Sequence, residues 1–273
     1  MSTEVPSWPT ALGVSDADRI SLLGHDLPTE LMGSVGLTEL ALWMMTLERP
    51  TPGQVRMLDT VLVALADHGF TPTVLSARLT LLSAPESLQG ALAAGLLGSG
   101  SRFLGVTENS GEFLAAAVAT AEPMPTNPAG WDELALAALT RCREQGQLVP
   151  GLGHHLHKEG DPRTPVIIEV ARQTGTYGPH LALFEAIGRV HHQVLGRHLP
   201  LNGAGVCGAA LADLGVPMAM LRGVAMLARC AGLLGQLAEE MRHPMAYELF
   251  HLVDDHTVPL AETSAQPPAP SQD

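Results

Sequence analysis

Apolar residues recur along most of this 273-residue chain at the spacing of one face of an α-helix. After the helix-breaking pair Pro52-Gly53, for example, Val55, Leu58 and Leu62 lie three and four residues apart. Similar segments cover residues 37–48, 87–98, 111–121, 131–144, 164–173, 180–196, 205–214 and 217–242. Ala and Leu, which favour helices, dominate these segments. The pattern therefore predicts an all-α fold.

Signals for other kinds of structure are few. The run VIIEV at 166–170 is the one short strand candidate. Residues 1–15 and 262–273 are rich in Pro, Ser and Thr and lack apolar periodicity, so we expect both ends to be disordered. No stretch of about 18 apolar residues is free of charge, which argues against a membrane span. The N-terminal residues also lack the basic and apolar regions of a signal peptide.

The amino-acid composition limits the kinds of partner that this chain could bind. The chain is 46% hydrophobic and only 16% charged, with a formal net charge of -13, which is typical of a globular protein with much buried surface. An acidic balance argues against nucleic acid or an anionic membrane as a partner, because both require a basic face. Cys142, Cys207 and Cys230 have no CxxC spacing and indicate reduced thiols in a cytoplasmic protein.

The segment VPGLGHHLHKEGDPR, residues 149–163, gathers chemistry on a Gly/Pro loop. Gly151 and Gly153 allow the backbone to approach a ligand. Arg163 can hold a carboxylate through two hydrogen bonds, and a histidine can donate to a carbonyl oxygen. The loop therefore indicates a site for an acidic ligand, with a solvated loop and a chance histidine cluster as the alternative.

A metal site is a second interpretation of the histidines. Six of them could contribute: His154, His155, His157, His191, His192 and His198. Their spacing is not that of a known ligand motif such as HExxH. We therefore expect no metal.

Five segments occur in the order seen in the citrate synthase superfamily, and they most resemble its short members, the citryl-CoA lyases. They are LVALADHGFTPTVLSAR (62–78), GSRFLGVTE (100–108), VPGLGHHLHKEGDPRT (149–164), LPLNGAGVCGAALADLGVP (199–217) and ARCAGLLGQLAEE (228–240). The resemblance implies a helical, two-domain fold and a homodimer, with a small domain inserted in a large one. The expected bounds are 16–108 and 216–261 for the large domain and 109–215 for the small domain.

The resemblance also assigns roles to residues at matching positions. It implies that His68 contacts a 2-oxo acid and that His154 polarises the ketone oxygen of that acid, so both are expected to be catalytic. Arg163 and Arg229 match arginines that hold carboxylates, and Asn202 lies in the matching LPLN segment. The coenzyme A site is expected at Val149, Pro150, Gly151, Leu152, Gly153 and Lys158.

Two positions depart from the family pattern on the acyl side of the site. Phe103 stands where citrate synthases have a histidine that donates to the thioester carbonyl. Ala204, in LPLNGAG, stands where the pattern LPLNVDG has the aspartate that moves the α-proton, and the bulk before it is lost at Gly203. Gln236 replaces a histidine common in relatives. The acids or bases that could substitute by sequence are Glu108, His155, His157 and Glu239.

The sequence thus predicts an enzyme that makes or breaks a carbon–carbon bond between an acyl-CoA and a 2-oxo acid. Its prototype is the conversion of citryl-CoA to acetyl-CoA and oxaloacetate. The coenzyme A thioester would be a substrate, and we expect no tightly bound cofactor. Because of Phe103 and Ala204, two alternatives stay open: the same fold diverted to a related reaction, and an inert subunit that binds an oxo acid or coenzyme A.

Overall fold

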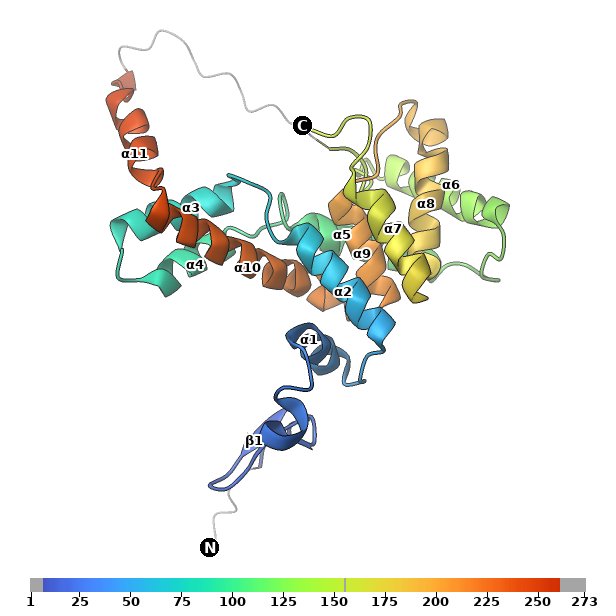
Figure 1. The fold of residues 1–273 in the computed structure, drawn as a ribbon. Helices are drawn as coiled ribbons and strands as arrows, with labels where there is room; N and C mark the ends of the chain where they lie inside the picture. Colours follow the sequence, from blue (N-terminus) through green and yellow to red (C-terminus); the bar gives the residue numbers. More distant parts are fainter. Residues whose placement is uncertain (1–6, 155, 261–273) are drawn as a thin grey trace, which may run out of the picture. The chain divides into compact units, whose positions relative to one another are not determined.

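The computed structural model describes residues 7–154 and 156–260, which are mostly helical (Figure 1). The predicted all-α class is confirmed. The helices are α1 (Leu37–Thr46), α2 (Pro52–Leu65), α3 (Pro72–Ser83), α4 (Leu88–Leu97), α5 (Gly105–Val118), α6 (Pro128–Glu144), α7 (Arg163–Thr174), α8 (Pro179–Leu195), α9 (Gly203–Asp213), η2 (Met218–Met220), α10 (Leu221–Arg242) and α11 (Ala246–Asp255). The strand candidate at 166–170 lies inside α7, where Ile167, Ile168 and Ala171 share a buried helix face.

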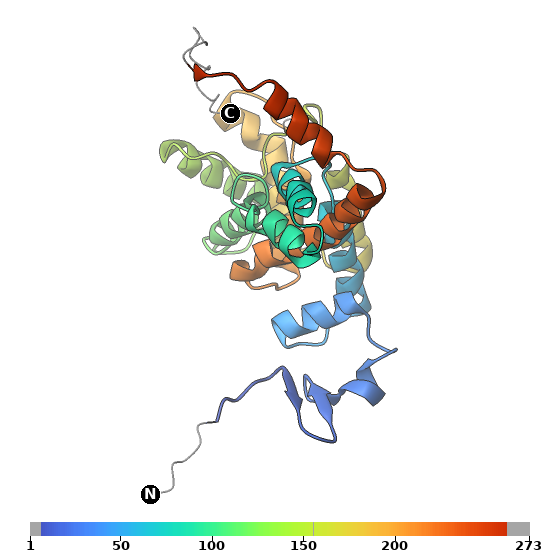
Figure 2. The same cartoon turned by 90° about the vertical axis from the view of Figure 1, so that its left-hand side faces the viewer.

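The chain also contains a small sheet that the apolar pattern did not predict. Strands β1 (Gly13–Ser15), β2 (Ile20–Leu22) and β3 (His25–Asp26) pair antiparallel and precede a π-helical turn, η1 (Leu27–Leu31). Figure 2 shows the strands in blue, side by side. The expected disorder of residues 1–15 is therefore wrong for 13–15. Residues 1–6 and 262–273 lie outside the described part of the chain.

The chain divides into two compact units. The first unit comprises residues 1–67 and 100–229, and the second comprises 68–99 and 230–273. These bounds differ from those expected, because the predicted small domain, 109–215, packs together with α2 and part of α10 in one unit. The physical reason is that α2 lies against α7 and α9, so 109–215 has no separate core.

The core of the first unit is built around α8 and α9, whose buried residues include Phe184, Ile187 and Leu211. Small residues allow α9 to approach its neighbours closely. A Cβ on Gly208 would collide with the Thr107 backbone oxygen in α5, and one on Gly111 would lie 3.2 Å from the Gly208 oxygen. Helices α5 and α9 are therefore in close backbone contact at these two glycines.

The second unit has its own smaller core. Val74, Ala77 and Leu81 of α3 pack with Ala91 of α4 and with Leu233 and Leu237 of α10. Next to this core the Arg78 side chain is only 1% exposed, and its Nη1 donates to Glu240 over 2.8 Å. Glu240 also accepts the backbone N–H groups of Met245 and Ala246, which caps the start of α11.

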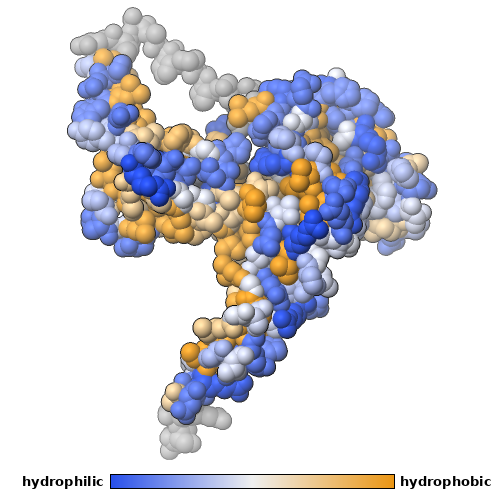
Figure 3. Space-filling model, viewed as in Figure 1, coloured by the Kyte–Doolittle hydropathy of each residue, from blue (hydrophilic) through white to orange (hydrophobic). Residues whose placement is uncertain are grey.

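One helical segment, Met218–Arg242, is long and apolar enough, by length and composition alone, to cross a membrane. Arg222 and Arg229 interrupt its apolar run. Leu221 and Leu237 lie in the cores of the two units. Figure 3 shows orange, hydrophobic residues exposed on this face of the molecule. The absence of a membrane span stays a prediction.

Candidate active site

The glycine loop that carries the predicted ligand site is fixed to the segment before α9. Gly153 donates its N–H to the Pro200 oxygen over 2.8 Å, and Asn202 donates its N–H to the Gly151 oxygen over 2.9 Å. The Asn202 amide Nδ2 reaches the Gly153 oxygen at 2.8 Å. Its Oδ1 accepts from Gly205 N and caps α9. Asn202 therefore ties the loop to the helix.

Gly151 is required by this arrangement. Its φ of +85° lies in the left-handed region, and an added Cβ would lie 2.7 Å from the Phe184 ring and 3.2 Å from the Gly205 Cα. The loop backbone thus rests directly on α8 and α9. Any larger residue at 151 would lift the loop from the helices that support it.

His154 has a defined hydrogen-bonding direction. Its Nδ1 accepts the backbone N–H groups of Leu156 and His157, at 3.1 and 3.0 Å. In the neutral ring the proton therefore lies on Nε2. Nε2 is 3.9 Å from Asp161 Oδ2, and the side chain is only 9% exposed. The neutral His154 ring therefore carries its N–H donor at Nε2.

Asp161 lies at the centre of the site with a fully buried carboxylate. It accepts from the N–H, Nε and Nη2 of Arg163 at 3.0, 3.0 and 2.8 Å, and from Gly203 N at 2.7 Å. Burial alone would raise the pKa of Asp161, but these hydrogen bonds outweigh burial and hold the pKa well below its ordinary value. Asp161 is therefore an anionic anchor and unsuited to act as a base.

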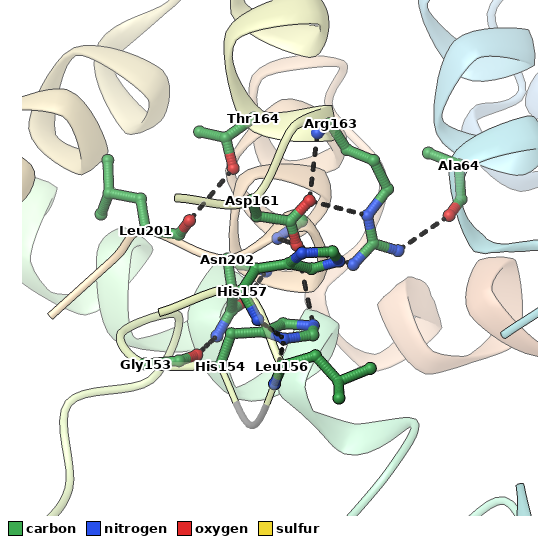
Figure 4. Close-up of polar contacts among 12 residues, drawn as sticks. Ala64, Gly153, His154, Leu156, His157, Asp161, Arg163, Thr164, Leu201 and Asn202 are labelled. Atoms are coloured by element: carbon green, nitrogen blue, oxygen red, sulfur yellow. Dashed lines mark hydrogen bonds and ion pairs between the residues drawn. The ribbon is translucent and has the colours of Figure 1, made fainter. Parts of the chain in front are cut away.

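Arg163 is the first residue of α7, and only some of its guanidinium N–H groups donate hydrogen bonds to the protein (Figure 4). Nε and Nη2 donate to Asp161, and Nη1 donates to the Ala64 oxygen at 3.1 Å. Hydrogen bonding to Asp161 raises the pKa of Arg163 despite burial. Three of the five guanidinium N–H groups are thereby engaged. The other two lie on Nη1 and Nη2, the pair that can grip a carboxylate.

Arg229 is a second, largely buried cation in the same unit, and the charge of Asp67 acts on it. It is 7% exposed, and its Nε and Nη1 have no hydrogen-bond partner in the described part of the chain. Burial lowers the pKa of Arg229, and the charge of Arg163 lowers it further, while Asp67 acts in the opposite direction. Unpartnered N–H groups on a buried cation are costly for a fold.

A family model described as citrate synthase, C-terminal domain, matches residues 18–248. The chain belongs to the citrate synthase family. Among solved structures, citryl-CoA lyase from Hydrogenobacter thermophilus matches with a TM-score of 0.79 and 25% identity over 96% of each chain. ATP citrate lyase from Methanothrix soehngenii, in complex with citrate and coenzyme A, has a TM-score of 0.73 and 18% identity over 98% of this chain and 43% of its own.

Two curated relatives match over shorter stretches. Citrate synthase of Deinococcus radiodurans is 27% identical over 201 residues, which is 70% of this chain and 48% of that protein. Probable ATP-citrate synthase subunit 1 of Schizosaccharomyces pombe is 33% identical over 137 residues, which is 49% of this chain and 19% of that protein. This member of the citrate synthase family thus spans half or less of the length of those two relatives.

The remaining family positions are distributed over both units. His68 follows α2 as the first residue of the second unit, and its expected contact with the oxo acid stays a prediction. Lys158 is exposed on the loop, whereas Val149 and Gly151 are buried. Phe103 is 52% exposed in the turn before α5. The role of these residues toward coenzyme A also stays a prediction.

Ala204 is the second residue of α9 and lies between Gly203 and Gly205. This first helical turn carries no side chain able to transfer a proton. In citrate synthases, by resemblance, an aspartate here moves the α-proton. Ala204 therefore follows directly after Gly203, whose N–H donates to Asp161. The Asp161 carboxylate already accepts hydrogen bonds from Arg163 and Gly203.

The substitute acids suggested by the sequence are mostly engaged elsewhere. Glu108 is paired with Arg222 in the first unit. In the second unit Glu239 pairs with Arg78, whose Nε also donates to Gln236 over 3.1 Å. The His157 ring lies tilted against that of His154, with ring centroids 4.6 Å apart. His155 lies outside the described residues.

Other histidines have structural contacts. His191 Nε2 accepts the Leu199 N–H at 2.8 Å, and its Nδ1 faces the Ile187 oxygen at 3.0 Å, so neither nitrogen is available to a metal. His192 and His198 stack on each other. Among the described residues, the cluster whose spacing could hold a metal is instead His251, Asp254 and Asp255, on exposed α11. The expected absence of a metal stays a prediction.

The structure adds two residues that the sequence does not predict. Asp161 joins Arg163 to the start of α9. Arg78 is the buried centre of the α3–α10 contact. The signal for Asp161 was its place two residues before Arg163 in DPR, which suits local pairing.

Proposed function

We propose that this chain is an enzyme of the citrate synthase type that makes or breaks the carbon–carbon bond between an acyl-CoA and a 2-oxo acid. The prototype is cleavage of citryl-CoA to acetyl-CoA and oxaloacetate. The observation that carries the proposal is Arg229, a buried guanidinium with two unpartnered nitrogens in the same unit as Arg163 and His154. A substrate with several carboxylates supplies the missing anions.

Each polar group then has a task that fits its geometry. Arg163 and Arg229 hold the carboxylates of the oxo acid. The Nε2–H of His154 stabilises negative charge on the oxygen that is ketone in oxaloacetate and hydroxyl in citryl-CoA. Asp161 keeps Arg163 in place and stays ionised. The loop at Val149–Gly153 receives coenzyme A. The citrate and coenzyme A bound to the Methanothrix soehngenii relative support this substrate class.

The direct test is turnover of citryl-CoA. Purified protein is incubated with citryl-CoA, and any oxaloacetate is coupled to malate dehydrogenase so that NADH oxidation reports its release. We expect turnover that falls about 10²-fold or more in His154→Ala, since an oxyanion donor contributes on that order. Turnover that is no higher than in His154→Ala would contradict the proposal.

A second candidate function is binding without turnover. It is favoured by the Gly203-Ala204-Gly205 turn, which has no group to move the α-proton. Substitution Ala204→Asp places a carboxylate in the first turn of α9, where the helix dipole favours an anion. If the site is otherwise active, this variant gains lyase activity relative to the parent protein. Tight oxaloacetate or coenzyme A binding with no turnover, before and after the substitution, would instead support an inert binding subunit.

We also propose that the chain forms a homodimer. Exposed apolar side chains in the second unit support this proposal, among them Leu234 and Met241 on α10 and Phe250 on α11. Contiguous exposed apolar surface commonly marks a protein interface. Sedimentation equilibrium tests it, and a monomer at micromolar concentration would contradict it.

A further inference from the structure

Gly203 is in close contact with the guanidinium of Arg163. A Cβ added at Gly203 would lie 2.6 Å from Cζ and 2.8 Å from Nη2 of Arg163. Real Cβ atoms essentially never approach another heavy atom that closely. Arg163 can therefore lie across the first turn of α9 only because residue 203 has no side chain.

The atoms that would be displaced belong to the end of a side chain. Other glycines of α9 differ in this respect: a Cβ on Gly205 would lie 2.5 Å from the Gly151 Cα, and one on Gly208 would meet the Thr107 backbone oxygen. Substitution at 205 or 208 would therefore disturb the fold, whereas substitution at 203 would move a guanidinium.

Moving that guanidinium has a specific cost. Arg163 is held by two side-chain hydrogen bonds to Asp161 and one to the Ala64 oxygen. It also borders an apolar groove of about 570 Å³ between α2 and α7, which gives the displaced side chain room. A side chain at 203 would thus break the three contacts that orient Arg163 while leaving the helices in place.

We propose that Gly203 is a positioning residue, which sets the Arg163 guanidinium across the start of α9 so that its two unused N–H groups meet a substrate carboxylate. That this ligand is an oxo acid rests on the proposed function. The positioning of Arg163 by Gly203 does not depend on that function.

The test is a double-mutant cycle with Gly203→Ala and Arg163→Ala, read out as oxaloacetate affinity by calorimetry. Gly203→Ala is expected to weaken binding about tenfold or more, the size of one lost charge-assisted hydrogen bond. In the Arg163→Ala background, Gly203→Ala is expected to have no further effect. The matched control is Gly235→Ala, because a Cβ at Gly235 meets nothing within 4 Å.

Two results would overturn the proposal: unchanged affinity in Gly203→Ala, or an equal loss from Gly203→Ala with and without Arg163. If Gly203→Ala alone fails to fold, the stability of the double variant is compared with that of Arg163→Ala by urea unfolding. Equal stability is expected if the collision is with Arg163, and a further loss overturns the proposal.

A ligand-independent measurement separates this inference from the proposed function. The Nε–H resonance of Arg163, assigned by its absence in Arg163→Ala, is expected to be protected from solvent exchange by Asp161. That protection is lost in Gly203→Ala and kept in Gly235→Ala. If the parent protein binds no oxaloacetate, the proposed function fails, while the resonance still tests Gly203. Protection that persists in Gly203→Ala overturns the positioning role.

Discussion

Asp161 and Arg163 face each other side-on, with Arg163 Nε 3.0 Å from Oδ1 and Nη2 2.8 Å from Oδ2 of the carboxylate. Because the same carboxylate accepts the Gly203 N–H, one buried anion links the glycine loop, α7 and α9. The pair thus determines both the stability of this region and the direction of the arginine. Those two consequences can be measured separately.

Asp161→Asn is expected to destabilise the fold by about 3 kcal/mol, as is typical when one partner of a buried pair is removed. The neutral amide cannot satisfy both the guanidinium and the Gly203 N–H as an anion does. Urea unfolding measures the change. The control is Asp132→Asn, which breaks the more exposed pair with Arg189 and should cost about 1 kcal/mol or less. Equal losses for the two variants would contradict the central role of Asp161.

Stability should depend on pH through the same carboxylate. The pKa of Asp161 is held below its ordinary value of 3.8. A depressed pKa in the folded state gives stability that is fully present above the unfolded pKa and is lost as pH falls below it. The difference in unfolding free energy between the parent protein and Asp161→Asn should therefore be constant from pH 7 to about 5 and shrink below about 4. A difference that grows on acidification would contradict this sign.

Removing the charge of either of two buried arginines should change the thermal stability of the protein in opposite directions. Arg229→Leu removes a buried guanidinium with two unpartnered nitrogens, for which the attraction to Asp67 does not outweigh burial. We therefore expect thermal stability to rise and oxaloacetate binding to be lost. Arg78→Leu leaves Glu240 buried without its cation, so we expect a loss of about 3 kcal/mol or more. Thermal unfolding of both variants makes the comparison. Destabilisation by Arg229→Leu would show that the fold needs this charge.

His154→Asn separates the structural contacts of His154 from its chemistry. The Asn amide oxygen can replace Nδ1 as acceptor for Leu156 and His157, but Asn has no group at the position of Nε2. We expect coenzyme A affinity within about twofold of the parent protein. Lyase turnover should fall about 10²-fold or more. A parallel loss of coenzyme A binding would mean that the loop itself has rearranged.

The helices could be predicted from the sequence because their apolar faces and caps are local features. The Thr51–Gln54 capping box before α2 is one example. The β1–β2–β3 sheet could not, since strands of two or three residues are too short to show a usable periodicity. The β-branched run in α7 shows the reverse case, in which burial of Ile167 and Ile168 outweighs strand propensity.

The sequence predicted which residues form the candidate site more fully than it predicted the hydrogen bonds between them. Motif resemblance identified His154, Arg163 and Arg229, and the geometry gives each a hydrogen-bonding state. The bond from Gly203 to Asp161 joins residues 42 positions apart, and no local spacing reveals such a pairing. The bounds of the units differ from those expected for a similar reason: the contacts of α2 with α7 and α9 join segments far apart in the chain.

The unpartnered guanidinium of Arg229 also has a consequence for the lifetime of the protein in a cell. A ligand that supplies its anion stabilises only the folded chain, so the fraction of unfolded molecules falls as ligand concentration rises. Proteases act on that fraction. The abundance of this protein is therefore expected to follow the supply of its substrate, without any change in its synthesis.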